Sequence, residues 1–357
     1  MSTSPPDHTA GAELGPAAGP GPVPAGSAGP VPGYGPGHGG GPVPAPLTVE
    51  VFTGPETAFF ATSSLIMGER TAILVDAQLT RSAGRELAEW IAGKGRALLA
   101  IVITHQHPDH YFGAEEVLRL FPKAQLLAAP PVVAEIARTA AAKVAQWKPV
   151  YGDDIPDQPL LPAPLLPQPL MIDQQLIRVL HLGQGDCAAS TLVHVPSAGT
   201  VLAGDFAYYG THVWTADTGP TERQEWLRNL ARIADLGADR VVAGHRAPGG
   251  DDDARQVLGF TDAYLRDFDR ALADHPEDPE ALAAAVNERW GALTLPLILE
   301  LGAAANTEAA TATALEQAAG GAEEGHEVAR RAPAAEENGI VDAEIVEEPG
   351  EGTGGER

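Results

Sequence analysis

Residues 104–110 read THQHPDH, and four of these side chains are of types that bind metal ions. His105 and His107 are two residues apart, and Asp109 and His110 follow at once. Imidazole nitrogens suit zinc, iron and similar ions, while a carboxylate adds a harder, charged ligand. A loop that directs all four side chains into one space would hold one or two ions. The segment therefore predicts a metal centre.

The loop must be positioned by the strand that precedes it. The run ALLAIVI at residues 97–103 is continuously apolar, which is typical of a strand buried on both faces. Apolar residues at helical spacing over residues 81–95 predict a helix before it. A proline-rich connector, residues 153–169, separates this first half from a second run of strands followed by helices. The order predicts an α/β (α+β) fold with αββα layering and the chemistry at strand ends.

With this layout the sequence resembles the metallo-beta-lactamase fold superfamily. THQHPDH matches the HxHxDH motif of that family, VLAGD places Asp205 at the end of a strand, and VVAGH places His245 at the end of another. The match covers about residues 47–275. The resemblance implies a four-layer αββα sandwich of the metallo-beta-lactamase type, and a metal-dependent hydrolase.

The resemblance also implies two divalent metal ions. Zinc is the first choice for both, with manganese or iron as alternatives. A water or hydroxide between them would be the nucleophile, and Asp109 would orient it or take its proton. The implied ligands are His105, His107 and a third residue for the first ion, and Asp109, His110 and His245 for the second, with Asp205 bridging.

The third ligand to the first ion is normally a histidine in this family, and this chain has HLGQGDCAASTLVHVP in its place. Depending on the loop length, the ligand position falls on Asp186 or on Gln184. We favour Asp186, because a carboxylate is a better ligand than a neutral amide oxygen. Losing one imidazole would weaken the preference for zinc and admit manganese or iron. The neighbouring Cys187 is either a thiolate ligand or, as we favour, a small buried apolar side chain.

Two more residues are candidates for the substrate pocket. Tyr208 lies three residues after Asp205, and in lactonases of this superfamily a tyrosine at that offset donates to the substrate carbonyl. A Tyr208 hydroxyl near the metals would stabilise an oxyanion in the same way. His212, seven residues after Asp205, would line the pocket or contact the substrate.

The two ends of the chain differ in composition from the middle. Residues 1–46 hold twelve glycines and twelve prolines, which predicts a disordered arm. Residues 303–357 hold thirteen acids and three arginines, which predicts an acidic disordered tail. The middle, residues 47–302, is expected to be one metallo-beta-lactamase-like domain that includes the C-terminal helices. The sequence does not identify partners for the arm or the tail.

The net charge of −25 argues against nucleic acid and anionic membranes as partners, because both need a positive surface. No apolar run is long enough for a membrane span, and no signal peptide is recognisable. One cysteine excludes an intramolecular disulfide, and a cytoplasmic location fits.

The sequence therefore predicts a metallo-hydrolase of a small ester, lactone or thioester that uses a metal-bound hydroxide. An iron-dependent persulfide dioxygenase-like enzyme is one alternative, and a non-catalytic relative with a degraded first metal site is the other. The lack of a basic inserted domain disfavours nucleic-acid processing, and the lack of length for a flavodoxin-like domain disfavours flavin-linked di-iron chemistry.

Overall fold

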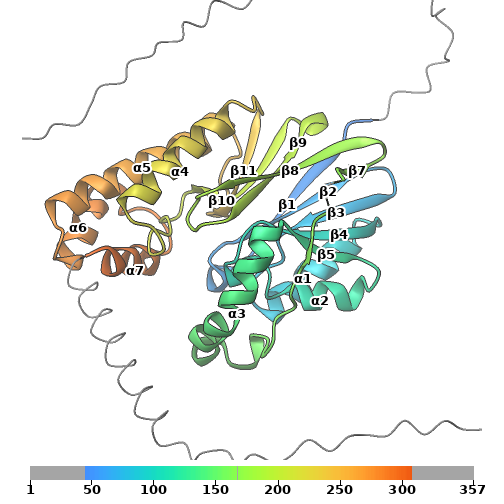
Figure 1. Ribbon diagram of the computed structural model, residues 1–357, viewed down its shortest axis with the longest axis horizontal. Coiled ribbons are helices and arrows are strands. Elements are labelled where there is room, and N and C mark those ends of the chain that lie inside the picture. Colours follow the sequence, from blue (N-terminus) through green and yellow to red (C-terminus); the bar gives the residue numbers. More distant parts are fainter. Residues whose placement is uncertain (1–44, 167, 308–357) are drawn as a thin grey trace, which may run out of the picture. The chain divides into compact units, whose positions relative to one another are not determined.

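The computed structural model describes residues 45–166 and 168–307. The glycine- and proline-rich arm and the acidic tail expected from the sequence fall almost entirely outside these residues. The description below concerns the part of the chain between them, which forms two sheets flanked by helices (Figure 1).

The first sheet keeps the order of its strands in the chain. Its first three strands are antiparallel, and from the third strand onward the neighbours are parallel. Its strands are β1 (Thr48–Thr53), β2 (Thr62–Met67), β3 (Thr71–Val75), β4 (Ala97–Ile103), β5 (Gln125–Ala128) and β6 (Ala163–Pro164).

The second sheet has the order β11-β10-β9-β8-β7. Neighbouring strands are antiparallel except β10 and β11, which are parallel. Its strands are β7 (Leu170–Ile172), β8 (Gln175–Gly183), β9 (Ser190–Val195), β10 (Thr200–Tyr209) and β11 (Arg240–Arg246).

The two sheets pack face to face through branched apolar side chains. Val75 and Val102 of the first sheet share one buried cluster with Val193, Leu202 and Val242 of the second. Along β4 the neighbours of Val102 point the other way, so that strand is buried on both faces at its carboxyl end. This is the environment that its uninterrupted apolar run predicts.

Three helices cover the outer face of the first sheet, namely α1 (Arg81–Ala92), α2 (Ala114–Leu120) and α3 (Pro130–Tyr151). Thr80 caps α1, because its hydroxyl accepts the Ala83 N–H at 3.1 Å. Gly84 of α1 and Gly113 before α2 let these segments approach closely, since a Cβ on Gly84 would lie 2.6 Å from the Gly113 carbonyl oxygen.

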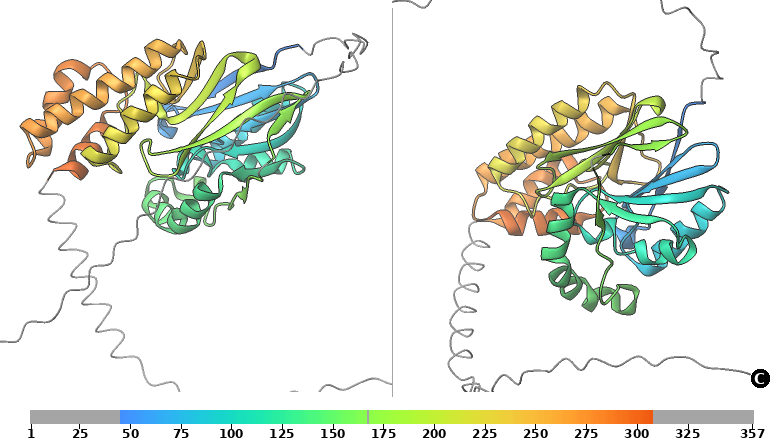
Figure 2. Two further views of the ribbon diagram at one scale, coloured as in Figure 1. Left: turned by 45° about the horizontal axis from the view of Figure 1, so that its top comes forward. Right: turned by 45° about the vertical axis from the view of Figure 1, so that its right-hand side comes forward.

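Four helices are associated with the second sheet, namely α4 (Pro220–Ala234), α5 (Ala254–Asp274), α6 (Pro279–Trp290) and α7 (Pro296–Asn306). Trp226 of α4 and Phe268 of α5 are fully buried in the cluster that these helices form with β10. Figure 2 shows the resulting layers, with helices outside each sheet. The αββα sandwich predicted from the sequence is confirmed.

The last helix, α7, extends four residues beyond the expected domain limit at residue 302. Ala303 is fully buried, and Asn306 ties the helix end to the second half of the chain. Its Nδ2 donates to the Thr215 carbonyl at 2.9 Å, and its Oδ1 accepts from Arg223 at 2.8 Å. The alanine-rich composition of this segment therefore belongs to a packed helix rather than to the acidic tail.

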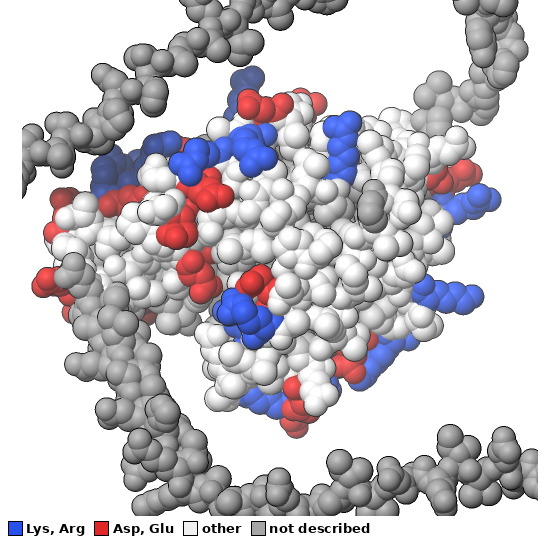
Figure 3. All heavy atoms as spheres, viewed as in Figure 1, with Lys and Arg blue, Asp and Glu red and all other residues white. Residues whose placement is uncertain are grey.

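The described surface carries both signs of charge. On the face shown in Figure 3, basic and acidic side chains lie next to one another at several places. Among the described helices, none combines the length and the apolar character that crossing a membrane would need.

Candidate metal centre

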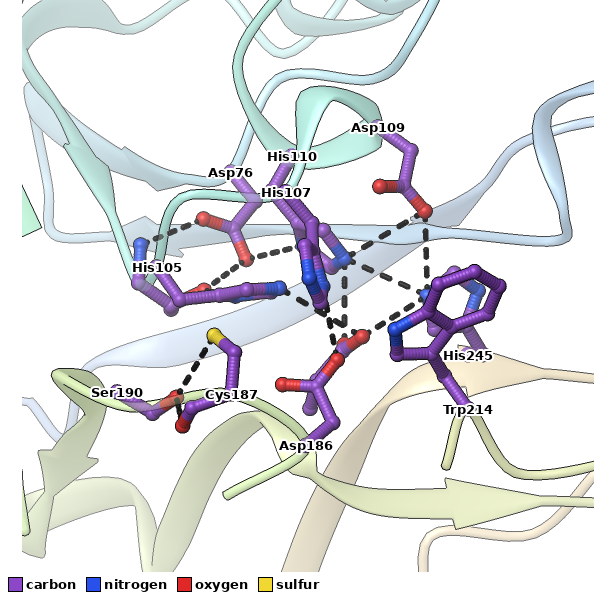
Figure 4. Close-up of polar contacts among 12 residues, drawn as sticks. Asp76, His105, His107, Asp109, His110, Asp186, Cys187, Ser190, Trp214 and His245 are labelled. Atoms are coloured by element: carbon purple, nitrogen blue, oxygen red, sulfur yellow. Dashed lines mark hydrogen bonds and ion pairs between the residues drawn. The ribbon is translucent and has the colours of Figure 1, made fainter. Parts of the chain in front are cut away.

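The predicted ligands converge from both sheets. The loop after β4 carries His105, His107, Asp109 and His110, and β10 and β11 supply further side chains beside it (Figure 4). The turn Pro108–His110 is a single 3-10 turn, which places residues three apart, here His107 and His110, on the same side of the backbone. A buried hydrogen bond from Thr62 Oγ1 to the Ala243 carbonyl, at 2.6 Å, links the two sheets.

His105 and His110 each form a hydrogen bond through Nδ1, on the side away from the site, to one shared network. The Asp76 carboxylate accepts Nδ1–H of His110 at 2.8 Å and the Thr104 hydroxyl at 2.8 Å. The same hydroxyl lies 2.9 Å from Nδ1 of His105. Because Thr104 donates to Asp76, its oxygen accepts from His105. Both histidines can therefore present an unprotonated Nε2 to the site, whose lone pair is what a metal ion binds.

The other two histidines are held in the same manner by different partners. His245 donates its Nδ1–H to the Phe59 carbonyl at 2.7 Å, which leaves Nε2 facing the site. His107 is reversed: Nε2 contacts the Asp217 carboxylate at 2.9 Å, and Nδ1 faces inward. Four imidazoles thus have one nitrogen fixed outside and one inside the same space.

Asp205 lies at the centre of the inward-facing atoms. Its carboxylate oxygens lie 3.2 Å from His110 Nε2 and 3.1 Å from His245 Nε2. His105 Nε2 is 3.6 Å away, and Asp109 approaches from the other side, with 3.3 Å between its carboxylate and His245. This is the position that the resemblance implies for a bridging ligand.

Asp186 completes the group around the first pair of histidines. Its carboxylate lies 2.8 Å from Nδ1 of His107 and is fully buried. Gln184, the alternative ligand, turns its side-chain amide to the Gly185 carbonyl at 3.0 Å. The loop can bring Asp186 inward because Gly183 adopts a left-handed backbone with φ of 92°. Of the two candidates for the missing histidine, Asp186 is the one beside the histidines.

The donor atoms fall into three sets whose members all lie within 4.8 Å of one another. His105 Nε2 and Asp186 Oδ1 are buried and have no hydrogen-bond partner within residues 45–166 and 168–307. Buried polar atoms are almost always partnered, and a cation bound here would partner both of these atoms. The residues therefore fit divalent metal ions. The sets are His105, His107, Asp186 and Cys187; His105, His110 and Asp205; and Asp109, His110 and His245.

Carboxylates raise the pKa of three of the four imidazoles, whereas burial and the neighbouring His110 hold the pKa of His105 well below its usual value. Burial lowers the pKa of a histidine, but Asp186 and Asp217 outweigh this effect at His107 and raise its pKa to about 10. At His245 burial is likewise outweighed, chiefly by Asp205, and the pKa rises to about 10. A site that attracts protons so strongly also attracts cations, and metal binding must release those protons.

Tyr208 and His212 both line the cavity in front of the site. The Tyr208 hydroxyl donates to Asp205 at 2.7 Å and is 3.2 Å from Asp186, and its ring stacks on that of His245 at 5.1 Å. His212 contacts the Tyr264 hydroxyl at 2.9 Å through Nδ1. Tyr208 is therefore in direct contact with two carboxylates of the centre, whereas His212 lines the cavity in front of it.

The cavity offers about 50 Å³ to the centres of water-sized molecules, within about 500 Å³ that includes open solvent at its mouth. Its floor carries the polar side chains of the centre, including His107, Asp109 and His245. Its walls are mainly apolar and aromatic, contributed by helices α3 and α7 and the loops beside them. The wall residues are Phe59, Trp147, Trp214, Leu295 and Ile298.

Three residues that the sequence analysis did not select contribute to the site, namely Asp76, Trp214 and Asp217. Asp76 follows β3 in a left-handed conformation, with φ of 61°, and its place at a strand end beside Thr104 could have revealed it. Asp217 fixes His107 and accepts from Trp214 Nε1 at 2.9 Å. Trp214 and Asp217 lie in a loop without regular spacing, so no sequence pattern marks them.

The family model of the metallo-beta-lactamase superfamily matches residues 57–245, which is more than half of the 357 residues. The chain belongs to the metallo-beta-lactamase superfamily. The sequence-based resemblance is thereby confirmed. Members of this superfamily are generally metal-dependent hydrolases, and the superfamily binds divalent metals.

Solved structures of the superfamily share the fold. A metallo-beta-lactamase family protein from Thermus thermophilus is 24% identical with a TM-score of 0.51, over 71% of this chain and 91% of that one. A beta-lactamase domain protein from Burkholderia ambifaria is 17% identical with a TM-score of 0.51, over 72% of this chain and 84% of that one. No curated protein sequence matches this chain.

Proposed function

We propose that this superfamily member is a hydrolase of a small ester, lactone or thioester that depends on two divalent metal ions, most simply zinc. One observation carries the proposal: four imidazoles each have one nitrogen anchored outside the site and the other turned toward a buried carboxylate, which is Asp205 for three of them and Asp186 for His107. Burying several carboxylates in one space costs free energy, and bound cations would offset that cost.

The residues divide into two sets around Asp205. His105 and His107 would hold the first ion with Asp186, and Asp109, His110 and His245 would hold the second. When bound, such ions lower the pKa of water and polarise a carbonyl or ester oxygen.

Asp109 and Tyr208 are the candidates for roles beyond binding a metal ion. Asp109 lies on the cavity floor, where its free oxygen can accept a proton from an attacking water. The Tyr208 hydroxyl lines the same cavity and can turn from Asp205 to donate to an oxygen that gains negative charge.

The cavity supports a compact, partly apolar substrate. Trp147, Trp214 and Phe59 provide aromatic surface suited to an acyl chain or a lactone ring. Lys143 is the one lysine or arginine among the described lining residues, and it lies 4.0 Å from the Asp217 carboxylate. Because this pairing reduces its positive potential, a highly charged substrate is disfavoured. A cytoplasmic location, and the absence of nucleic-acid and membrane partners, remain predictions from composition.

The test is hydrolysis by the full chain, loaded with zinc or manganese, of lactones, aryl esters and acyl thioesters. We expect turnover that a chelator abolishes and added metal restores. Asp109→Asn should lower kcat by at least about 100-fold, the lower range for loss of a general base. Asp157→Asn is the matched control, because that carboxylate is exposed on the proline-rich connector.

The same experiment separates the alternatives. Tyr208→Phe with wild-type turnover would remove Tyr208 from the mechanism. Bound iron with oxygen uptake on a glutathione persulfide would favour the dioxygenase-like alternative. Metal binding without turnover on any of these substrates would favour a non-catalytic relative.

A further inference from the structure

The sulfur of Cys187 lies inside the first group of ligands. Cys187 follows Asp186 in the loop between β8 and β9 and is 1% exposed. Its Sγ and one donor atom from each of His105, His107 and Asp186 all lie within 4.8 Å of one another. Figure 4 shows the sulfur on the side of its loop that faces His105 and Asp186.

The surroundings of this sulfur differ from those of a packed apolar cysteine. Although buried, Cys187 belongs to none of the apolar clusters formed by the described part of the chain. Its sulfur forms a hydrogen bond with Ser190 Oγ at 3.6 Å, and the Ser190 hydroxyl donates to the Cys187 carbonyl at 3.0 Å. The serine therefore closes the loop, and its oxygen can accept only the thiol proton, so the lone pairs of the sulfur are not used in this contact.

Two independent atoms at the same place lack partners. His105 Nε2 and Asp186 Oδ1 are both buried, and neither has a hydrogen-bond partner among the described residues. A cation between them would satisfy both atoms. The same cation would lie within reach of the sulfur, because all these donors belong to one group.

We propose that Cys187 is a ligand of the first metal ion, which is then held by two imidazoles, a carboxylate and a thiolate. The inference rests on the metal binding proposed above and assigns one more ligand to it. The thiol proton leaves to solvent as the ion binds. Thiolates bind zinc and cobalt well, so Cys187 compensates in strength for the histidine that this chain lacks.

Besides the bridging Asp205, the first site would then have four protein ligands and the second would have three. A larger number of protein ligands leaves fewer positions for water and holds an ion more firmly. The first ion should therefore resist chelators longer than the second. A chelator that removes the two ions at the same rate would contradict this ordering.

Cobalt(II) tests the ligand directly by spectroscopy. The full chain is stripped of metal, cobalt(II) alone is added, and the near-ultraviolet spectrum is searched for the charge-transfer band from thiolate to cobalt. The chain has a single cysteine, so a band can arise only from Cys187. We expect the band in the wild-type chain during binding of the first equivalent.

Variants provide the comparison. Cys187→Ser should lose the band and bind the first equivalent of cobalt at least about tenfold more weakly. Even the loss of a residue that hydrogen-bonds to a metal ligand lowers metal affinity about 10–100-fold. Ser190→Ala, which removes the hydroxyl beside the sulfur and keeps the thiol, should retain the band.

The outcomes separate the two proposals. Visible cobalt bands without the charge-transfer band in the wild-type chain would overturn the assignment of Cys187 and leave a metal centre intact. Failure to bind cobalt at all would overturn the proposed function as well. The decisive spectrum is that of the wild-type chain, so it does not depend on the folding of a variant.

Discussion

Asp76 should couple the stability of the fold to the orientation of a metal ligand. It accepts three hydrogen bonds in a fully buried setting: Thr104 N–H at 2.9 Å, the Thr104 hydroxyl at 2.8 Å and His110 Nδ1–H at 2.8 Å. Asp76→Ala removes both acceptor oxygens and with them all three hydrogen bonds. We therefore expect it to impair folding and metal binding together.

The expected loss of stability follows from these contacts. The Thr104 amide and His110 Nδ1–H would be left buried without acceptors, at about 1–3 kcal/mol each. Asp76 has φ of 61°, and alanine is disfavoured there by roughly 1 kcal/mol. The total is about 3–7 kcal/mol, a large part of the 5–15 kcal/mol typical of a domain. Asp76→Asn keeps one acceptor and the shape, so its cost should be nearer 1–3 kcal/mol.

Urea unfolding in the presence of a chelator measures the stability term, and competition titration with zinc measures the binding term. With His110 no longer oriented, the affinity of the second site should fall about 10–100-fold. Asp173→Asn is a matched control, because Asp173 also has a positive φ, 49°, and its hydrogen bond within the described part of the chain is to the Glu69 N–H rather than to the centre. If both Asp76 variants matched wild type in stability and zinc affinity, this reasoning would be refuted.

Three further changes test other parts of the centre. Asp217→Asn should lower the affinity of the first site for zinc about 10–100-fold in a competition titration, because Asp217 anchors His107 at 2.9 Å. An unchanged affinity would contradict that role. Burial lowers the pKa of His212 to about 4. Between pH 6.5 and 4 the unfolded chain therefore binds a proton at His212 that the folded chain does not bind, and the free energy of unfolding falls as the pH drops through this range. His212→Asn should reduce that loss in acid denaturant titrations by up to about 3 kcal/mol, and parallel pH profiles would argue against it. Gly244→Ala should abolish normal metal uptake, measured by elemental analysis, because a Cβ would lie 1.9 Å from Asp205 Oδ1, and wild-type metal content would show that the backbone can move there.

The sequence predicts much of the centre because most ligands follow apolar strand segments. His105 and its neighbours follow β4, whose run of apolar residues is continuous. The sequence predicts Asp205 at the end of a strand, but Asp205 lies inside β10, which continues to Tyr209 beyond a register shift at Gly204, and His245 is the last residue but one of β11. Strand segments that meet at one edge of the sandwich bring together residues that are distant in the sequence. The layering is predictable for the same reason, since each strand must bury its apolar faces.

The remaining features depend on distances that only the fold provides. Asp217 lies in an irregular loop, and nothing in its spacing connects it to His107. Cys187 has two interpretations in the sequence, and only the closeness of its sulfur to His105 favours a metal ligand. The end of α7 depends on the contacts of Asn306 rather than on composition, which is why it extends past the expected limit.

The most direct test of the two-ion centre is the number of metal ions per chain in the purified protein, measured by elemental mass spectrometry. Asp186 and Cys187 in place of the third histidine predict about two equivalents of zinc or another divalent ion, retained through dialysis. Protein that retains no metal ion would contradict the two-ion centre and the hydrolase proposed from it.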